Sequence, residues 1–417
     1  MSGTLIVVSE KGMTGLVSGL NFRIMKKKLT STYSIRWLEN IADVDQAAWD
    51  ELAEPLTTPF LEWQWLHQME ASGSATAKTG WLPRHLTLWS DRNLVAAAPL
   101  YIKGHSAGEF VFDHAWADLA QRLDIAYYPK LVGMSPFTPM TGYRFLIAPG
   151  EDEGALTEIM VAEIDRFCDQ YQLSGCSYLF VDPQWHSMLA NQKFSCWKHQ
   201  SYSWRNRDYQ TFEDYLSMFN SNQRRNIKRE RQAMEKHRIS LEVIAGNQIP
   251  DTFIPVIFDF YVRTNEKFGP WGCRFLNYSF FEGLYQNYRH RLVLVSASNG
   301  QEHPEAPVGM SLLVTKGDRL YGRYWGSSQR INNLHFNACY YSPIEWAISN
   351  EINSFDPGAG GTHKLRRGFR AVPNYSLHRF ADQRLRQIMQ SHIDEINRLQ
   401  QEQIDALNSD LPFAVQT

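Results

Sequence analysis

Apolar and polar residues alternate in many short runs along this 417-residue chain, and segments with helical spacing lie between those runs. The segment HLTLWSDRNLVAAAPLYIKG, at 85–104, predicts two strands joined at the polar turn Asp91-Arg92-Asn93. Strands that alternate with helices are typical of mixed α/β layers and not of a helix bundle or a β-sandwich. The pattern therefore predicts an α/β protein.

The pattern of the first half of the chain returns in the second half. The segment RLVLVSASNGQEHPEAPVGMSLLVTKG, at 291–317, again predicts two strands, and an aromatic-rich helix precedes each strand pair. After each pair, a helix leads into a short strand that ends in an acid, Asp182 in one half and Asp356 in the other. A similarity at a spacing of about 175–205 residues is too long for a solenoid repeat and indicates two related lobes.

These repeats divide the chain into an N-terminal lobe at 33–200 and a C-terminal lobe at 201–380. The segment CWKHQSYSWRNRDYQTF at the boundary predicts the strand that closes the first lobe. Residues 381–417 predict an amphipathic helix and a tail, and this helix either packs on the second lobe or pairs with another chain. Residues 1–32 differ from the rest, and we interpret them as a disordered tail or as the product of an over-called start codon, with Met25 as the true start.

Composition and charge exclude several classes of protein. With 43% hydrophobic and 21% charged residues the chain has the composition of a globular protein. A net charge of only -2 supplies no global field that would attract DNA or anionic lipid, so any anion site must be local. Five cysteines without a CxxC pair argue against a disulfide framework and a zinc site, and they indicate a reducing compartment, the cytoplasm. No apolar run approaches the ~20 residues of a membrane span.

The segment FEDYLSMFNSNQRRNIKRERQAMEKHR, at 212–238, contains neither Gly nor Pro and predicts one long helix. Three of its basic residues fall at i, i+4 and i+7: Arg224, Lys228 and Arg231. Together with Arg225, this face has enough donors to bind a phosphate group. The alternative is a solvated helix face whose charge is balanced by neighbouring glutamates.

The segment GAGGTHKLRRGFR, at 358–370, is the second candidate site. Gly360 and Gly361 allow a backbone to pass close to a ligand. Three candidate anion-binding side chains follow: Lys364, Arg366 and Arg367. The alternative is a plain loop with a basic edge.

Several segments of this sequence carry a family likeness. They are TGWLPRHLTLW, FDHAWADLA, SPFTPMTGYRFL, NSNQRRNIKRERQ, NEKFGPWGCRFL, LYGRYWGS, LHFNACYYSPIEWAI and GAGGTHKLRRGF. Over roughly residues 33–400 the chain resembles the Fem-type aminoacyltransferases, and more closely a bacterial family described as predicted N-acyltransferases of the peptidoglycan biosynthesis or recognition type. The resemblance implies two tandem GNAT-like lobes, each a mixed β-sheet flanked by helices. It also implies transfer of an acyl or aminoacyl group to an amine, with Arg367 or Arg366 in the place of a lysine of the Fem group.

A transferase of this kind needs little covalent machinery, since the amine attacks a bound thioester or ester directly. The absence of GxSxG and HExxH motifs fits this chemistry, and we expect no metal. The candidates for accepting the amine proton are His363, His335 and Glu345. A lone histidine is more often structural.

The acyl donor stays open between aminoacyl-tRNA and acyl-CoA, and we expect no tightly bound cofactor. The loop that would hold coenzyme A at a helix N-terminus reads SSQRINNLHFN here, without the two glycines that it needs, and VGMSPFTPMTG in the first lobe does not match either. This departure favours aminoacyl-tRNA. The rivals are an acetyl-CoA-dependent N-acetyltransferase and a binding protein that keeps the fold without catalysis.

Two further pairs are candidates for substrate binding. Arg323 and Tyr324 lie in the aromatic strand LYGRYWGS, where an arginine suggests the wall of a cleft. Asp113 and His114 lie in GEFVFDHAWAD, whose acids either recognise substrate or cap the following helix. We expect a phosphate-bearing small molecule or aminoacyl-tRNA as the partner, and a monomer or a homodimer.

Overall fold

The computed structural model describes residues 20–23, 32–189, 192–269, 272–299 and 306–414. The predicted tail 1–32 lies outside these residues except for Thr32 and the strand β1 (Leu20–Arg23), so both interpretations of the tail stay predictions. None of the helices in the described ranges is long and apolar enough to cross a membrane.

Helices and strands alternate in the first half of the chain, as the sequence predicts. Its elements are β2 (Thr32–Leu38), α1 (Gln46–Ala53), α2 (Trp63–Ala71), β3 (Trp81–Pro83), β4 (His85–Ser90), β5 (Asn93–Ala98), β6 (Leu100–Lys103), α3 (His114–Arg122), β7 (Lys130–Gly133), β8 (Leu146–Ile147), α4 (Glu153–Gln170), β9 (Gly175–Tyr178), α5 (Pro183–Leu189) and β10 (Ser195–Arg205).

The second half follows a similar order. Its elements are α6 (Phe212–Ser217), α7 (Ser221–Lys236), β11 (Ile239–Ala245), α8 (Phe253–Glu266), α9 (Tyr278–Tyr288), β12 (Leu292–Asn299), β13 (Pro307–Lys316), β14 (Arg319–Ser327), α10 (Leu334–Phe336), a π-helical turn (Asn337–Tyr341), α11 (Ser342–Ser349), β15 (Ser354–Asp356), a 3-10 helix (Thr362–Arg367), β16 (Arg370–Phe380) and α12 (Gln383–Ser409).

The helix predicted over 212–238 is in fact two helices, α6 and α7. Asn220 separates the two helices, because its side chain accepts a hydrogen bond from the backbone N–H of Gln223 and so caps the start of α7. Phe219, just before this cap, forms a β-bridge with Phe413 from the other end of the chain. The single long helix was therefore a wrong prediction.

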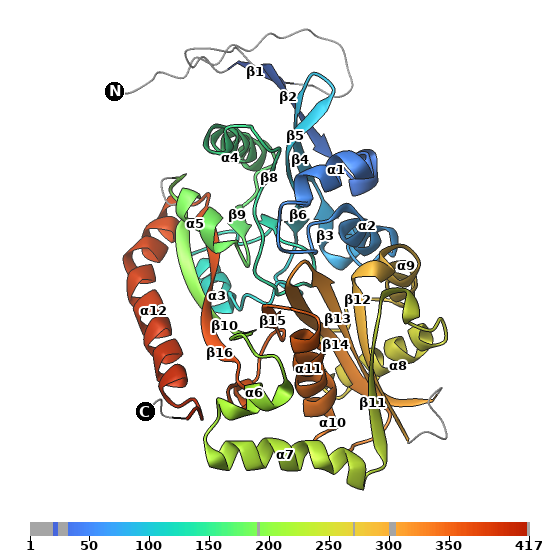
Figure 1. Ribbon diagram of the computed structural model, residues 1–417. Helices are drawn as coiled ribbons and strands as arrows, with labels where there is room; N and C mark the ends of the chain where they lie inside the picture. The colour runs from blue at the N-terminus through green and yellow to red at the C-terminus, as the bar shows by residue number, and fades with distance from the viewer. Residues whose placement is uncertain (1–19, 24–31, 190–191, 270–271, 300–305, 415–417) are drawn as a thin grey trace.

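The strands form two sheets (Figure 1). The large sheet has the order β11-β12-β13-β14-β15-β10-β16-β9-β7-β6-β3, and the small sheet has the order β1-β2-β4-β5-β8. Pro99 separates β5 from β6, so that β5 pairs with β4 in the small sheet whereas β6 pairs with β7 in the large one. The large sheet thus contains strands from both halves of the chain.

The last strand of each half pairs with a strand of the other half. β10 pairs with β15, and β16 pairs with β9. The two exchanged strands also pair with each other, from Ser195 opposite His378 to Ser203 opposite Arg370. The segment 195–205 is the predicted strand, but its neighbours in the sheet are β15 and β16 and not β9. Each half therefore depends on a strand of the other half to pair with its own strands in the large sheet.

Each half also contains one parallel strand pair. β7 runs parallel to β9, with α4 between them in sequence, and β14 runs parallel to β15, with α11 between them. Parallel neighbours need such a crossover connection. The same unit at matching places in both halves supports the internal similarity that the sequence indicates.

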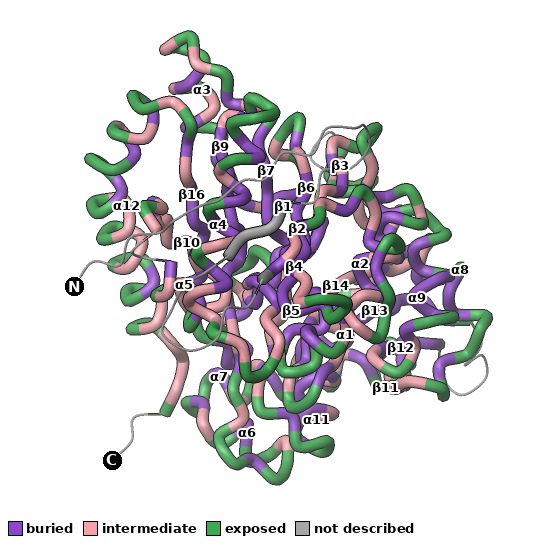
Figure 2. Tube along the Cα trace, turned by 90° about the horizontal axis from the view of Figure 1, so that it is seen from above, coloured by how far each residue is buried: buried purple, intermediate pink, exposed green. Residues whose placement is uncertain are grey.

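Helix α12 packs along the exchanged strands and not on the second half alone. In Figure 1 it lies beside β10 and β16. Its buried residues Leu385 and Met389 contact Trp116 and Tyr127 of the first half, whereas Ile404 joins the core of the second half. Figure 2 shows buried segments concentrated on the central strands and exposed ones on outer helices and turns. The helix therefore covers the junction of both halves.

Candidate functional site

The parallel strands β14 and β15 separate from each other after Tyr321, which lies opposite Asp356. β14 continues to Ser327, whereas β15 ends at Asp356 and a glycine-rich segment follows it. Gly360 and Gly361 in this turn have φ of 73° and 81°, a conformation that favours glycine. We call the region where the ladder of β14 with β15 ends the β14/β15 gap.

A β-bulge lies at the gap. The register of β14 against β13 jumps from Gly322 opposite Leu313 to Tyr324 opposite Leu312, so Arg323 is passed over in this ladder. The extra residue of a bulge keeps its backbone groups out of the ladder. Arg323 therefore has no directly opposite partner in the ladder with β13.

The side chain of Arg323 connects the gap to the first half of the chain. Its guanidinium donates to the carbonyl oxygen of Phe137 at 2.8 Å and to the hydroxyl of Tyr324 at 3.0 Å. It also lies over the ring of Phe60, with 5.5 Å to the centroid. Both Arg323 and Tyr324 thus lie at a junction between the two halves, and Tyr324 is half-buried against aromatic rings.

Two ionisable groups border the gap, Asp356 and Lys364. Burial raises the pKa of Asp356 to about 6, although the N–H of Gly358 donates to its carboxylate at 2.9 Å. Burial lowers the pKa of Lys364 to about 8, and the charge of Asp356 opposes that change. The Lys364 ammonium donates to the carbonyl oxygens of Gly358 and Ala359 at 2.6 and 3.0 Å. Both groups therefore titrate near neutral pH.

A buried ion pair holds the 3-10 helix against α7. Arg367, of which only 3% is exposed, donates to both carboxylate oxygens of Glu230 at 2.9 and 2.8 Å. Tyr341 donates its hydroxyl to the same carboxylate, and the guanidinium of Arg367 lies 3.3 Å from the ring centroid of Phe336. Arg367 is thus bound within the protein, whereas the neighbouring Arg366 is exposed.

The two candidate histidines lie side by side next to this pair. The ring centroids of His335 and His363 are 5.7 Å apart, and Nε2 of His363 is 3.0 Å from the hydroxyl of Tyr340. Burial and the nearby cations Arg367 and Lys364 lower the pKa of both, that of His335 to about 3. Both rings are neutral at pH 7, and His335 is too weak a base to accept a proton efficiently there.

The basic face of α7 makes contacts within the protein. Arg224 donates to the carbonyl oxygen of Phe219 at 2.7 Å. Lys228 pairs with Glu213 at 3.1 Å in an exposed contact, and Arg225 is largely exposed on the same helix. Gln223 of the same helix donates to the carbonyl oxygen of Arg366 at 2.6 Å, so the start of α7 lies next to the gap segment.

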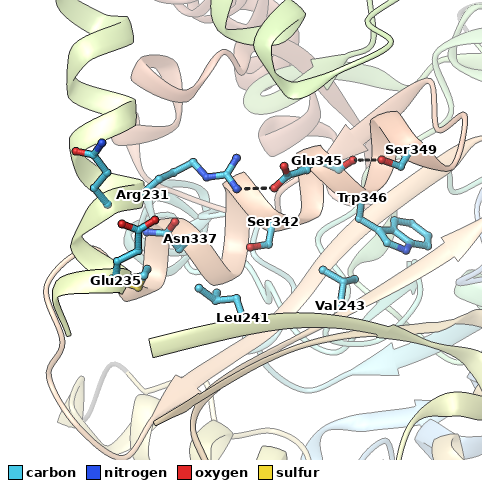
Figure 3. Close-up of a pocket in the computed structure, with 11 residues that line it drawn as sticks. Arg231, Glu235, Leu241, Val243, Asn337, Ser342, Glu345, Trp346 and Ser349 are labelled. Atoms are coloured by element: carbon cyan, nitrogen blue, oxygen red, sulfur yellow. Dashed lines mark hydrogen bonds and ion pairs between the residues drawn. The ribbon is translucent and has the colours of Figure 1, made fainter. Parts of the chain in front are cut away.

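Glu345 lies on the outer side of α11, away from His363. Figure 3 shows Arg231 of α7 reaching toward it, and the two side chains are 2.6 Å apart. They line a cavity of about 440 Å³ between α7, α11 and β11. The structure therefore does not bring Glu345 together with the histidines.

Asp113 and His114 lie in the first half, apart from the gap. Asp113 is 1% exposed, and it accepts from Lys130 at 2.6 Å and from Tyr127 at 2.8 Å. Although burial opposes its ionisation, the Lys130 ammonium outweighs that effect and lowers its pKa. Asp113 precedes α3, yet it makes no capping hydrogen bond within the described structure, and His114 is exposed.

The structure thus brings together His335, His363, Lys364 and Arg367, and it places Arg323 at the same gap. It adds two acids that the sequence did not mark as site residues, Asp356 and Glu230. Asp356 was visible only as the acid at the end of a predicted strand, and Glu230 only as a countercharge on the basic helix. Their roles depend on contacts with distant segments.

Known proteins of the same fold add to this geometry. The model of the FemAB-like family, described as peptidoglycan biosynthesis/recognition, matches residues 40–415. The crystal structure of FemX superposes with a TM-score of 0.50 and 11% identity, over 85% of this chain and 99% of FemX. The C-terminal domain of a putative lysylphosphatidylglycerol synthetase from Agrobacterium fabrum also gives 0.50, with 9% identity over 85% of this chain and 97% of that domain. No curated protein matches the chain.

These findings confirm the predicted fold class, an α/β protein of two tandem GNAT-like lobes, while the exact lobe boundaries stay predictions. The family match covers most of the sequence, including the β14/β15 gap and both exchanged strands. The chain belongs to the FemAB-like family of peptidoglycan biosynthesis and recognition proteins.

Proposed function

We propose that the chain is an N-acyltransferase that moves an aminoacyl or acyl group onto an amine acceptor in the β14/β15 gap. The observation that carries the proposal is the coincidence of three features there. The ladder of β14 with β15 ends there, the bulge leaves Arg323 without a partner in the ladder with β13, and Asp356 has a pKa of about 6. A base with a pKa near the working pH is suited to general base catalysis.

In the proposed reaction the acceptor amine attacks the carbonyl carbon of the donor ester or thioester. The N–H of Arg323 donates to the developing oxyanion, which lowers the barrier because the donor is already oriented. Asp356 takes the proton of the attacking amine, the bond from the carbonyl carbon to the leaving oxygen or sulfur breaks, and the leaving group is protonated. The products are an amide and the free alcohol or thiol.

The proposed acceptor is a cell-wall precursor that bears phosphate groups. The family description, peptidoglycan biosynthesis/recognition, supports this class of acceptor. The exposed guanidinium of Arg366 next to the gap is the proposed phosphate contact. Arg367 is the less suitable of the two, since Glu230 already occupies it.

The proposed donor is aminoacyl-tRNA. The segment after β14, Ser328–Asn333, contains no glycine pair to hold the pyrophosphate of coenzyme A. The helix that follows, α10, has only three residues and then widens into a π-helical turn. Titration of the purified protein with coenzyme A, followed by thermal shift, tests the rival donor, and a saturable rise in Tm would favour an acyl-CoA-dependent N-acetyltransferase.

The proposal is tested by incubating the full chain with pooled aminoacyl-tRNAs or acyl-CoAs and muropeptide precursors, and by detecting new amides with mass spectrometry. We expect transfer, and a loss of about 10²–10⁴-fold in rate for Asp356→Asn. Glu345→Gln is the matched control, because this acid faces the outer cavity. The proposal would be refuted if the chain showed no transfer and also bound none of the precursors.

The rival without catalysis is a binding protein that keeps the fold. The commitment of Lys364 and Arg367 to groups of the protein favours this candidate, since neither is free for a ligand. Precursor binding that Arg366→Ala weakens, without any turnover by the native chain, would support it. Rate loss in Asp356→Asn at unchanged precursor affinity separates the transferase from the binding protein.

A further inference from the structure

Two cysteines from separate elements of the first half line one surface cavity. Cys168 lies near the end of α4 and Cys176 lies in β9, and the cavity between them has a volume of about 320 Å³. The thiol of Cys168 lies 3.9 Å from the carbonyl oxygen of Gly175, the residue next to Cys176, and it interacts with the sulfur of Cys176. Both thiols are reduced in the structure and only 6% and 3% exposed.

The cavity has a basic wall beside the thiols. Arg379 lies opposite Cys176 in the ladder of β16 with β9, and Arg386 and Lys193 line the same cavity. The guanidinium of Arg379 is itself bonded to Asp165 of α4. Two thiols in contact, beside cations and open to a cavity, are the surroundings in which cysteines react with oxidants.

The protonation of the two sulfurs is unequal. The hydrogen bond from Cys168 lowers the pKa of Cys176, and the Arg379 guanidinium adds to this effect against the cost of burial. The same bond raises the pKa of Cys168, which donates it. We therefore assign Cys176 as the nucleophile of the pair and Cys168 as the thiol that holds the proton.

We propose that Cys168 and Cys176 form a redox-active pair that a peroxide converts into a disulfide. The sulfur of Cys176 attacks one oxygen of hydrogen peroxide, the O–O bond breaks, and Cys176 becomes a sulfenic acid as water leaves. The sulfur of Cys168 then attacks that of Cys176, the S–O bond breaks, and a second water leaves. Two thiols are oxidised, one peroxide is reduced to two waters, and a thiol reductant reverses the change.

The pair lies where oxidation would act on the junction of the two halves. Cys176 is in β9, the strand to which the exchanged strand β16 pairs, and it is also opposite Leu131 of β7. A disulfide ties α4 to this strand through a short loop. The site is independent of the β14/β15 gap, so the inference does not depend on the proposed transferase activity.

One peptide reports the state of both cysteines. Trypsin releases residues 167–193 as a single fragment that contains Cys168 and Cys176 and no internal Lys or Arg. The native full chain is treated with hydrogen peroxide, unfolded, alkylated with N-ethylmaleimide and digested. We expect a fragment two hydrogens lighter that carries no label, whereas untreated protein carries two labels and reduction after oxidation restores both.

Single substitutions separate the two roles. In Cys168→Ser the sulfenic acid of Cys176 should persist and be trapped by dimedone, and in Cys176→Ser the remaining thiol should stay unoxidised. Arg379→Gln should slow oxidation by about tenfold, the change in thiolate fraction that one pKa unit produces. It keeps both cysteines, and circular dichroism checks the fold of each variant.

The exposed Cys273 is the internal control for general oxidation. If peroxide oxidises Cys273 while the fragment 167–193 keeps two labels, the inference is wrong. The same holds if Cys168 reacts as fast in Cys176→Ser as in the native chain, because the pair would then have no defined nucleophile.

Discussion

Asp356 and Lys364 border the β14/β15 gap, and their ionisation should set how transfer depends on pH. The proton acceptor must be a carboxylate, so kcat/KM should rise with pH through about 6, the pKa of Asp356. It should fall above about 8, the pKa at which Lys364 loses the charge that holds the carbonyl oxygens of Gly358 and Ala359 beside the gap. Because Asp356 and Lys364 interact, the two apparent pKa values belong to the pair, and a pH profile of kcat/KM measures them.

In Asp356→Asn the rise of kcat/KM through pH 6 should disappear, whereas Glu345→Gln should keep both the rise and the fall above pH 8. A pH profile of Asp356→Asn that still rises through pH 6 would contradict the role of this acid.

The free energy of unfolding gives a second, independent test of the pKa of Asp356. The pKa of Asp356 is higher in the folded chain than its ordinary value of 3.8, so ionisation opposes folding as pH rises through about 6. Urea unfolding should therefore show that Asp356→Asn stabilises the protein more at pH 8 than at pH 5.

Breaking the ion pair of Arg367 with Glu230 should cost far more stability than breaking the exposed pair of Lys228 with Glu213. Arg367→Met leaves the Glu230 carboxylate without its buried cation, and we expect a loss of roughly 3 kcal/mol or more in the free energy of unfolding. Lys228→Met removes the partner of Glu213 in a pair whose side chains are 52% and 73% exposed. This control should change the same quantity by about 1 kcal/mol or less. If urea unfolding gave the same loss of free energy for Arg367→Met and Lys228→Met, burial of the Arg367 pair would not matter to stability as predicted.

At the scale of elements, β14 and α8 approach each other closely at Gly326. A Cβ atom there would lie 2.1 Å from the carbonyl oxygen of Phe260 in α8. Gly326→Ala should therefore push α8 off the strand that carries the Arg323 bulge and cost about 1–3 kcal/mol of unfolding free energy. Gly104→Ala is the control, since its Cβ would meet nothing within 4 Å and should change stability by about 0.5 kcal/mol at most. A Gly326→Ala variant as stable as the native chain would contradict this packing.

The elements that depend on local pattern were predictable from the sequence. The two strands predicted at 291–317 are present as β12 and β13. Of the two predicted at 85–104, the first is β4, whereas the second is divided at Pro99 into β5 and β6, which belong to different sheets. Short apolar runs bounded by turn residues therefore located the strands but not the division at Pro99. The break between α6 and α7 was not predicted. Phe219 there pairs with Phe413, and no local pattern indicates a partner so distant along the chain.

The same limit applies to the candidate site. The basic and glycine-rich segment 358–370 was marked by its composition, and it does border the gap. The contact of Arg323 with Phe137 and the contact of Arg367 with Glu230 join residues 186 and 137 positions apart. Spacing along the sequence says nothing about such pairs, so neither acid of the site, Asp356 or Glu230, could be assigned before the fold was known.

At the scale of the whole molecule, the exchange of β10 and β16 should make the two halves inseparable. Residues 1–207 expressed alone lack β16, the neighbour of both β9 and β10, and residues 208–417 lack β10. We expect each fragment alone to have no cooperative unfolding transition, and the two expressed together to form a folded complex. Near-ultraviolet circular dichroism and size-exclusion chromatography measure both outcomes. A folded, cooperative fragment 1–207 would contradict the interdependence.

The exchanged strands also have a consequence for synthesis of the chain. On the ribosome, β9 and β10 emerge well before β16, and at roughly 5–20 residues per second the delay is on the order of 10 s or more. During that time the backbone groups of β9 and β10 that face β16 in the finished sheet have no strand to pair with. The nascent chain therefore exposes an unpaired strand edge that can pair with other chains. A chaperone would protect it from aggregation until β16 has been synthesised.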